Sequence, residues 1–232
     1  PQPGENVLIL VDMPHESLTD HEAWRERRQM AEDWKLGFEA LANKMEFNVY
    51  PIMTYAATGA HNGPLPDIGE MDGTEIAFDD IFAESHIVVA MTEYSATAPL
   101  IEYARKFPHL RVASMPGVSP AMQDTALAVD HEKMAERCNL IDEKLSDAIA
   151  ARVLFVTGHQ MYFDLHHRHP EVDDGMLHQD TSGLGVINLP SGETFIAPYE
   201  GEIEDQPSET HGIIPLQCGV TRALIHVSEN RV

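Results

Sequence analysis

The chain has 232 residues, of which 43% are hydrophobic and 23% charged, so it is long enough to bury a core and has a globular composition. Its 15 lysines and arginines stand against 38 aspartates and glutamates, which gives a formal net charge of −23. Such a surface repels phosphate backbones and anionic lipids, so we expect neither nucleic-acid nor membrane partners. No apolar run approaches the ~20 residues that span a bilayer.

Short apolar runs, typical of strands covered on both faces, recur through the first half of the chain. They predict strands at 6–12, 48–55, 86–91 and 111–115. Pro51 interrupts the second run, which predicts an edge position or a bulge.

Helical patterns separate these runs. Thr19 and Glu22 form a capping box that opens a long helix, with an apolar face from Trp24 to Met45. The remaining intervals predict a long loop at 56–73 and helices near 74–84, 96–107 and 119–147. This alternation predicts a Rossmann-like α/β domain over 1–150, with a mostly parallel sheet and helices on both faces. No Gly-x-Gly-x-x-Gly follows the first strand, so a dinucleotide is not implied.

The pattern changes after residue 150, and residues 151–232 predict the start of a β-rich second region. Short strands separated by Gly and Pro turns are predicted at 152–157, 185–189, 194–197, 213–216 and 222–227. Residues 228–232 have the pattern of a hairpin turn with the start of a returning strand, so we expect the polypeptide to continue.

The chain has two cysteines, Cys138 and Cys218. Cys138 falls on the apolar face of a predicted helix, and two cysteines are too few for a disulfide framework. The sequence therefore predicts buried, reduced thiols and a cytoplasmic protein.

The most specific segment for chemistry is Asn188-Leu-Pro-Ser-Gly-Glu-Thr-Phe-Ile-Ala-Pro198. Its pattern predicts two strands joined by a Pro-Ser-Gly turn, with Glu193 at the lip. A carboxylate held by a rigid turn suits a divalent metal, and the alternative is a solvated turn glutamate.

This segment resembles the signature that carries a glutamate metal ligand in aminopeptidase T-like metallopeptidases. Two further stretches are similar to the same proteins, from Ala113 to Arg137 and from Asp164 through Arg168 to Asp174, so the resemblance covers roughly 85–232. It implies an aminopeptidase acting on N-terminal peptide bonds of small peptides, with Glu193 bound to Zn, Co or Mn. That family completes its site with a further Glu, His, Tyr and a His-x-Asp pair. In that family these residues lie in the half that follows the stretch matched here, so the resemblance implies that most of the catalytic centre is missing from this chain.

Several histidines are further candidates for contact with a metal or substrate, because neutral imidazole is a good metal ligand. On a strand, His166 and His167 would point to opposite faces, so only a turn could bring them together. The alternative is a polar loop over the active-site cleft. The candidates are His61 in the long loop, His159, His166, His167, His169 and His178, with Asp174 beside them.

Two other functions stay open. Dihydroxypyridine ring-cleaving dioxygenases share this general architecture and use a single ferrous iron, so a small-molecule substrate and Fe are the alternative. The Gly192-Glu193 turn favours the peptidase over the dioxygenase. The third candidate is a non-catalytic binding relative, and a homodimer is an open alternative for the assembly. Nucleophilic catalysis has little support, because no Gly-x-Ser-x-Gly elbow occurs.

Overall fold

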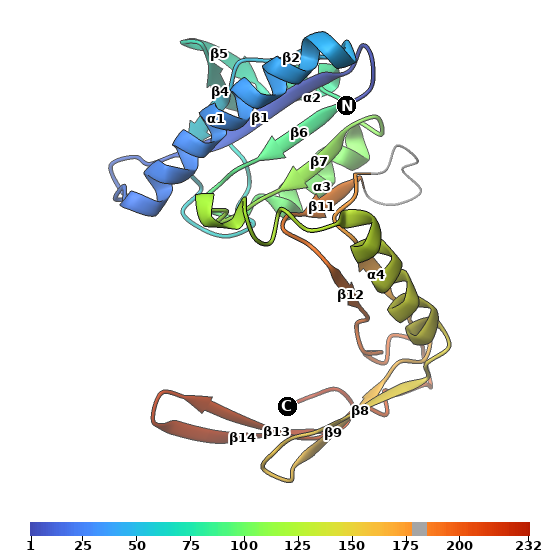
Figure 1. The fold of residues 1–232 in the computed structure, drawn as a ribbon. Helices are drawn as coiled ribbons and strands as arrows, with labels where there is room; N and C mark the ends of the chain where they lie inside the picture. Colours follow the sequence, from blue (N-terminus) through green and yellow to red (C-terminus); the bar gives the residue numbers. More distant parts are fainter. Residues whose placement is uncertain (178–184) are drawn as a thin grey trace. The chain divides into compact units, whose positions relative to one another are not determined.

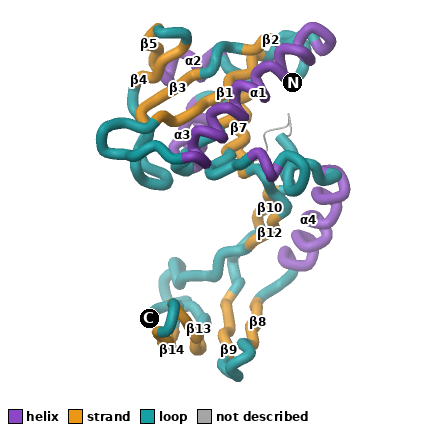
Figure 2. Tube along the Cα trace, turned by 60° about the vertical axis from the view of Figure 1, so that its left-hand side comes forward, coloured by secondary structure: helices purple, strands orange, loops and turns teal. Residues whose placement is uncertain are grey.

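The computed structural model describes residues 1–177 and 185–232. The chain folds into two compact units, each built from two chain segments: unit 1 from 1–134 and 174–192, and unit 2 from 135–173 and 193–232. Figures 1 and 2 show the order of the elements along the chain. Among the described residues, no helix combines the length and the apolar character that a membrane crossing requires.

Unit 1 is built on an eight-stranded sheet with the order β11-β7-β6-β1-β3-β4-β5, in which β2 also pairs with β1. All pairs from β11 to β3 are parallel, and the β3–β4 and β4–β5 pairs are antiparallel. The predicted mostly parallel α/β fold is therefore confirmed. The strands are β1 (Asn6–Met13), β2 (Asn48–Val49), β3 (Met53–Ala56), β4 (Ile68–Met71), β5 (Thr74–Ala77), β6 (Ile87–Ala90), β7 (Arg111–Ser114) and β11 (Val186–Asn188).

Strand β1 lies at the centre of this sheet because its side chains are apolar on both faces. Leu8 joins one buried core with Phe82 and Leu100, which belong to the helices α2 (Phe78–Glu84) and α3 (Thr97–Lys106). Ile9 points to the opposite face and joins a second core with Met30 of α1 (Glu22–Met45). Alternation along one strand thus fixes which helices cover which face.

The long helix α1 differs from its prediction at both ends. Its N-cap is His21, in extended backbone geometry, whose Nδ1 accepts a hydrogen bond from the Trp24 amide at 3.3 Å. Thr19 lies outside the helix, so the predicted capping box does not form. Met45, at the other end, is exposed, because only the first half of the helix is deeply buried against the sheet.

The region between the second and third predicted strands also differs. The run at 48–55 breaks into β2 and β3 around Pro51, and β3 lies inside the sheet, between β1 and β4, rather than at its edge. The hairpin β4–β5 occupies part of the predicted 56–73 loop and the start of the predicted 74–84 helix. Asp72 and Gly73 adopt positive φ and form its two-residue turn. An Asp-Gly pair is typical of such turns, but the residues after it were predicted to form a helix.

Unit 2 contains two antiparallel sheets. The smaller pairs β10 with β12, and the larger has the order β14-β13-β9-β8. The helix α4 (His131–Ser146) begins in unit 1 and ends in unit 2, and a 3-10 turn η1 (Pro120–Met122) precedes it. The strands are β8 (Ala150–Leu154), β9 (Gln160–Asp164), β10 (Glu171–Asp173), β12 (Glu193–Phe195), β13 (His211–Cys218) and β14 (Thr221–Val227).

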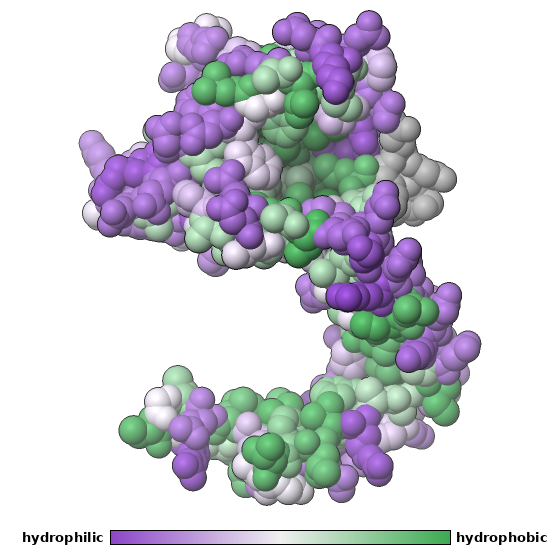
Figure 3. Space-filling model, in the orientation of Figure 1, coloured by the Kyte–Doolittle hydropathy of each residue, from purple (hydrophilic) through white to green (hydrophobic). Residues whose placement is uncertain are grey.

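The larger sheet of unit 2 consists of two hairpins, β8–β9 and β13–β14, that meet over a short distance. Only His211 and Gly212 of β13 pair with β9. A Cβ at Gly212 would lie 2.3 Å from the Gln160 carbonyl oxygen, so the close approach of the hairpins requires glycine there. Figure 3 shows apolar surface over these hairpins.

Two further expectations need correction. Strand β11, predicted as part of the β-rich region, pairs in parallel with β7 in the sheet of unit 1. Cys138 is buried as predicted, but Cys218 is exposed at the end of β13, because the tip of that hairpin has no apolar layer over it.

Candidate functional site

The polar residues of unit 1 gather where the parallel strands end. The chain places β3 on one side of β1 and later returns to place β6 on the other side, so the direction of winding switches between β1 and β6. In open α/β sheets, ligands bind outside the carboxyl ends of the strands at such a switch point. The candidate site is therefore the carboxyl edge of the sheet, where Asp12 of β1 meets the segment 92–95 that follows β6.

Asp12 joins these two strand ends. Its carboxylate is fully buried and accepts hydrogen bonds from the backbone amides of Glu93 at 2.8 Å and Tyr94 at 3.0 Å, and from the Trp24 indole at 3.0 Å. Burial raises the pKa of Asp12, and these hydrogen bonds together with the nearby Arg27 charge oppose that rise. Asp12 thus positions the 92–95 segment and does not face solvent itself.

Glu93 and Tyr94, held by Asp12, turn toward different neighbours. The Glu93 carboxylate pairs with the buried Arg27 guanidinium at 2.5 Å and lies 3.3 Å from His21 Nε2. Arg27 also donates to the Val118 carbonyl oxygen at 2.8 Å, so its charge is fully engaged. The Glu93 carboxylate is therefore committed to structure rather than available as a base.

Tyr94 forms an aromatic pair with His61, which lies in the loop that sequence reasoning singled out. The ring centroids of the two are 5.8 Å apart, and the Tyr94 ring also meets Trp24 edge-on at 6.1 Å. His61 Nδ1 accepts a hydrogen bond from the Ser95 amide at 3.0 Å. In the neutral imidazole this leaves the proton on Nε2, and His61 is exposed, so it can donate to a bound molecule.

Hydroxyl and amide groups extend the edge toward β7 and β11. Thr97 Oγ1 lies 2.8 Å from Ser114 Oγ and donates to Asn188 Oδ1 at 2.9 Å. Asn62 Oδ1 accepts from the Ala98 amide at 3.0 Å, at the first turn of α3. Neutral donors and acceptors from four chain segments thus line one edge, an arrangement that suits a small, polar, planar molecule.

Unit 2 brings together a second group of candidates, around the end of β9. The buried Asp164 carboxylate accepts from the Glu209 amide at 2.9 Å and from His166, whose Nδ1 lies 2.7 Å away. Burial alone would raise the pKa of Asp164, but these hydrogen bonds and the His166 imidazole together lower it. A cavity of about 510 Å³ lies here, lined by His166, His167 and Tyr199 among others.

His166 and His167 lie in a turn after β9. They are therefore not held on opposite faces, as they would be within a strand. His167 adopts a positive φ of 61°, and its Nε2 lies 3.1 Å from Gln206 Oε1, while its ring meets Tyr199 edge-on at 5.3 Å. The two imidazole centroids are 6.2 Å apart. Each ring is therefore engaged by a different neighbour.

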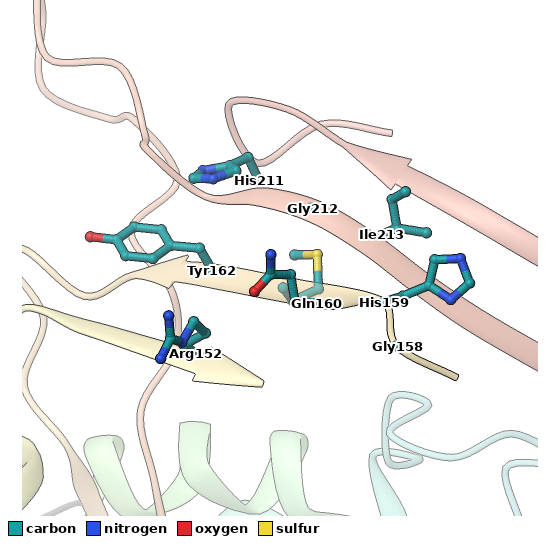
Figure 4. Close-up of a pocket in the computed structure, with 9 residues that line it drawn as sticks. Arg152, Gly158, His159, Gln160, Tyr162, His211, Gly212 and Ile213 are labelled. Carbon is teal, nitrogen blue, oxygen red and sulfur yellow. The ribbon is translucent and has the colours of Figure 1, made fainter. Parts of the chain in front are cut away.

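The other predicted residues lie apart from this pair. His159 Nδ1 lies 2.9 Å from Thr157 Oγ1. His159 also lines a cavity of about 560 Å³ between the β8–β9 and β13–β14 hairpins (Figure 4). Within that cavity the rings of Tyr162 and His211 stack with centroids 5.2 Å apart. His169 is exposed. His178 lies outside the described residues.

The Asn188–Pro198 segment does not form the predicted pair of strands. β11 pairs with β7 in unit 1, and β12 pairs with β10 in unit 2, so the two strands do not pair with each other. Glu193 is exposed at the start of β12, directly opposite Asp173. Asp174, in unit 1, is nearly buried and accepts from the Met176 amide at 2.9 Å.

In residues 1–177 and 185–232, no three side chains of His, Cys, Asp or Glu come together as a metal centre requires. The described residues therefore do not by themselves form the three-ligand site typical of a catalytic metal.

The sequence singled out His61, which the structure places at the carboxyl edge, but it did not point to Asp12, Tyr94, Thr97 or Asn188. Position at the end of an apolar run could have indicated two of them. Asp12 ends a buried apolar run, and Asn188 ends another, and parallel strands place such residues at one edge. The pairing of β11 with β7, which brings Asn188 there, could not be foreseen, since 71 residues separate the two strands along the chain.

Comparison with known proteins gives one structural relative. No protein-family model matches the sequence, and no curated protein shows significant similarity to it. The fold is similar to that of 2,5-dihydroxypyridine dioxygenase from Pseudomonas putida KT2440, with a TM-score of 0.58 and 13% sequence identity. The match covers 97% of this chain and 60% of the dioxygenase chain. At this identity the match establishes the shared fold.

The expected membership of the aminopeptidase T-like family is therefore wrong. The structural match is to a dioxygenase, and nothing in the comparisons supports a hydrolase, an aminopeptidase or a metalloprotease. The Gly192-Glu193 turn, which favoured the peptidase over the dioxygenase, was therefore a misleading signal. The Pro-Ser-Gly residues lie in the connection between a strand of unit 1 and a strand of unit 2, and such connections favour Pro, Ser and Gly whatever chemistry lies nearby.

We predict that Asp12 stabilises the protein more at acidic than at neutral pH. Its folded-state pKa is raised, so its contribution is fully present below the unfolded value of about 3.9 and is lost as the pH rises through the folded value. The free energy of unfolding of the wild type, relative to Asp12→Asn, should therefore increase as the pH falls. Urea denaturation at about pH 4 to 8 measures it. Asp124→Asn, at an exposed site, is the control, and a difference that does not vary with pH would contradict the prediction.

Proposed function

We propose that this protein belongs to a ring-cleaving dioxygenase system acting on a small dihydroxylated nitrogen heterocycle of the 2,5-dihydroxypyridine kind. The observation that carries the proposal is the structural match over 97% of the chain, which includes both units. The chain spans 60% of that dioxygenase, so the activity of a whole enzyme of this kind is part of the proposal.

The carboxyl edge of unit 1 supports a role in holding such a ring. A dihydroxylated pyridine is planar and carries hydrogen-bonding groups around its rim. The Tyr94 and His61 rings offer aromatic surface, and His61 Nε2 offers a donor. Asn188 and Thr97 offer neutral polar groups at the same edge. Pairing of rim hydroxyls with such groups, at a switch point, is the usual way in which α/β proteins orient small molecules.

A ferrous iron is the cofactor that the proposal implies. When bound, it would supply the site at which dioxygen is activated. The described residues do not fit an iron centre on their own, since no three suitable side chains converge in that part of the chain. An iron site would need ligands from outside the described residues, and the contribution of the described residues in this proposal is to bind and orient the ring.

Turnover tests the proposal directly. The purified chain is supplied with ferrous iron, 2,5-dihydroxypyridine and dioxygen, and dioxygen uptake is followed with an electrode. We expect uptake that depends on the ring compound, with both atoms of isotopically labelled dioxygen in the ring-opened product. Ring binding by calorimetry without any dioxygen uptake would contradict the dioxygenase and favour a non-catalytic binding protein.

The role of the carboxyl edge has its own test. His61→Ala removes an imidazole that packs against Tyr94 and can donate to the bound ring, so we expect at least ~10-fold weaker binding of 2,5-dihydroxypyridine, measured anaerobically by calorimetry. His109→Ala is the matched control, because His109 is an exposed histidine of unit 1 that precedes β7, at the opposite edge of the sheet. Equal losses in both variants would exclude a specific role for His61.

Glu193 remains a proposed metal ligand. Its carboxylate is exposed and lies opposite Asp173 in the β10–β12 pair, and carboxylate oxygens are the ligands that hard divalent cations prefer. We expect Glu193→Gln to weaken the binding of a divalent ion such as Mn²⁺ by at least ~10-fold, because it removes the charge and keeps the shape. Glu171→Gln, at the other end of β10, is the control. Unchanged Mn²⁺ affinity in calorimetry would show that Glu193 is a solvated residue.

A further inference from the structure

The loop between β3 and β4 is fastened to the start of α3 by two consecutive residues, His61 and Asn62. The Ser95 amide donates to His61 Nδ1 at 3.0 Å, and the Asn62 amide donates to the Ser95 carbonyl oxygen at 2.7 Å. The carboxamide oxygen of Asn62, Oδ1, accepts from the Ala98 amide at 3.0 Å and from Ser95 Oγ at 3.2 Å. These four hydrogen bonds hold both side chains against one short segment, 95–98.

The backbone at this point favours asparagine at position 62. Its φ of 59° lies in the left-handed region, which asparagine and aspartate tolerate better than most residues other than glycine. Glycine would lack the side-chain oxygen that caps α3, and the N-cap residue of that helix, Ala96, has no side chain that could cap it. Asn62 therefore combines the backbone geometry of the loop with the acceptor that the helix needs.

These hydrogen bonds fix which atoms of the two side chains remain for a ligand. A backbone amide can only donate, so His61 Nδ1 and Asn62 Oδ1 must both be acceptors, and neither group can turn over without losing its bond. The remaining atoms are His61 Nε2, which carries the proton of the neutral imidazole, and Asn62 Nδ2, which carries two protons. Both residues are exposed. The pair thus uses its acceptors inward and presents N–H donors outward.

Charged groups do not compete with this polarity. Residues 56–66 contain no aspartate, glutamate, lysine or arginine, although the chain as a whole carries a net charge of −23. Glu93 is the one charged residue of the segment 92–98, and its carboxylate is paired with Arg27. A neutral donor pair can take an uncharged acceptor, such as a carbonyl oxygen, without the cost of burying a charge.

We propose that His61 and Asn62 form a donor pair that recognises an acceptor oxygen on the rim of the bound ring, either a carbonyl or a deprotonated oxygen. A hydroxyl group can also accept, but its own proton then needs an acceptor that this pair does not provide. The pair therefore favours the tautomer of a dihydroxylated pyridine in which one oxygen is a carbonyl. The inference rests on the proposed function for the identity of the ring and adds which of its atoms meets residues 61 and 62.

Asn62→Asp tests the proposal because it changes the outward atom and keeps the inward one. Aspartate tolerates the left-handed backbone and still accepts from the Ala98 amide, but the outward Nδ2 becomes an oxygen that cannot donate. The probe is pyridine N-oxide, a planar ring with an acceptor oxygen and no N–H or O–H donor. We expect at least ~10-fold weaker binding in calorimetry. Ala60→Asp adds the same charge to the same loop at an exposed position, so this control should bind as the wild type does.

Nuclear magnetic resonance gives a second measurement that needs no substitution. The carboxamide protons of Asn62 should shift downfield as pyridine N-oxide is added, because they donate to its oxygen. Aniline, a ring of similar size whose amino group chiefly donates, should leave them unchanged. Undetectable binding of pyridine N-oxide, equal losses in Asn62→Asp and Ala60→Asp, or unmoved Asn62 protons would each overturn the proposal.

The outcomes separate this proposal from the enzymatic one. Dioxygen uptake with 2,5-dihydroxypyridine that Asn62→Asp leaves unchanged would overturn the donor pair and leave the dioxygenase standing. Binding of pyridine N-oxide that Asn62→Asp weakens, in a chain that takes up no dioxygen, would support the donor pair and contradict the dioxygenase.

Discussion

The buried carboxylate of Asp12 is the interaction on which the candidate site depends. The amides of Glu93 and Tyr94 and the indole of Trp24 converge on it, so one side chain ties the end of β1 to the segment after β6 and to α1. Burying an acidic group is costly, and only such a set of donors makes it tolerable. With the segment fixed, Tyr94 is held against His61, and the polar groups of α3 and β11 take their places beside it. Asp12 thus fixes the arrangement of the carboxyl edge although it is itself buried below the surface.

The two units use polar side chains differently. In unit 1 the neutral side chains of His61, Asn62 and Asn188 at the carboxyl edge are exposed, and the charged ones behind them, such as Arg27 and Glu93, neutralise each other. In unit 2 the Asp164 carboxylate holds the turn after β9 against the 206–210 segment. A ring-binding function draws on the first arrangement, where donors and acceptors remain accessible. The second arrangement is primarily a way of ordering loops that carry little apolar material.

The sequence predicted the parallel sheet well because β1 and β6 contain continuous apolar runs, which are typical of strands buried on both faces. It failed in two places, for different reasons. The β4–β5 hairpin lies in a stretch too polar to show a strand pattern, and β11 finds its partner far back in the chain. The peptidase signature failed for a related reason, since Pro, Ser and Gly report a turn and do not report what the turn is for. His61 was singled out because a long polar loop is a reasonable place for a functional residue, and its role stays a prediction. The end of an apolar run could have drawn attention to Asp12, but its hydrogen bonds to the segment after β6 could not be foreseen.

The interleaved order of the two units has a consequence for biosynthesis. The sheet of unit 1 is completed by β11, but β7 leaves the ribosome long before it, with the first half of unit 2 between them. At about 5–20 residues per second, β7 remains an open edge for several seconds of translation. During that interval its unpaired backbone groups are exposed to other nascent chains. Arg111, at the start of β7, pairs with Glu5 at 2.6 Å, and this ion pair joins residues that are both already synthesised. This ion pair can therefore hold the start of β7 in place while β11, the last strand of the sheet, is still being made.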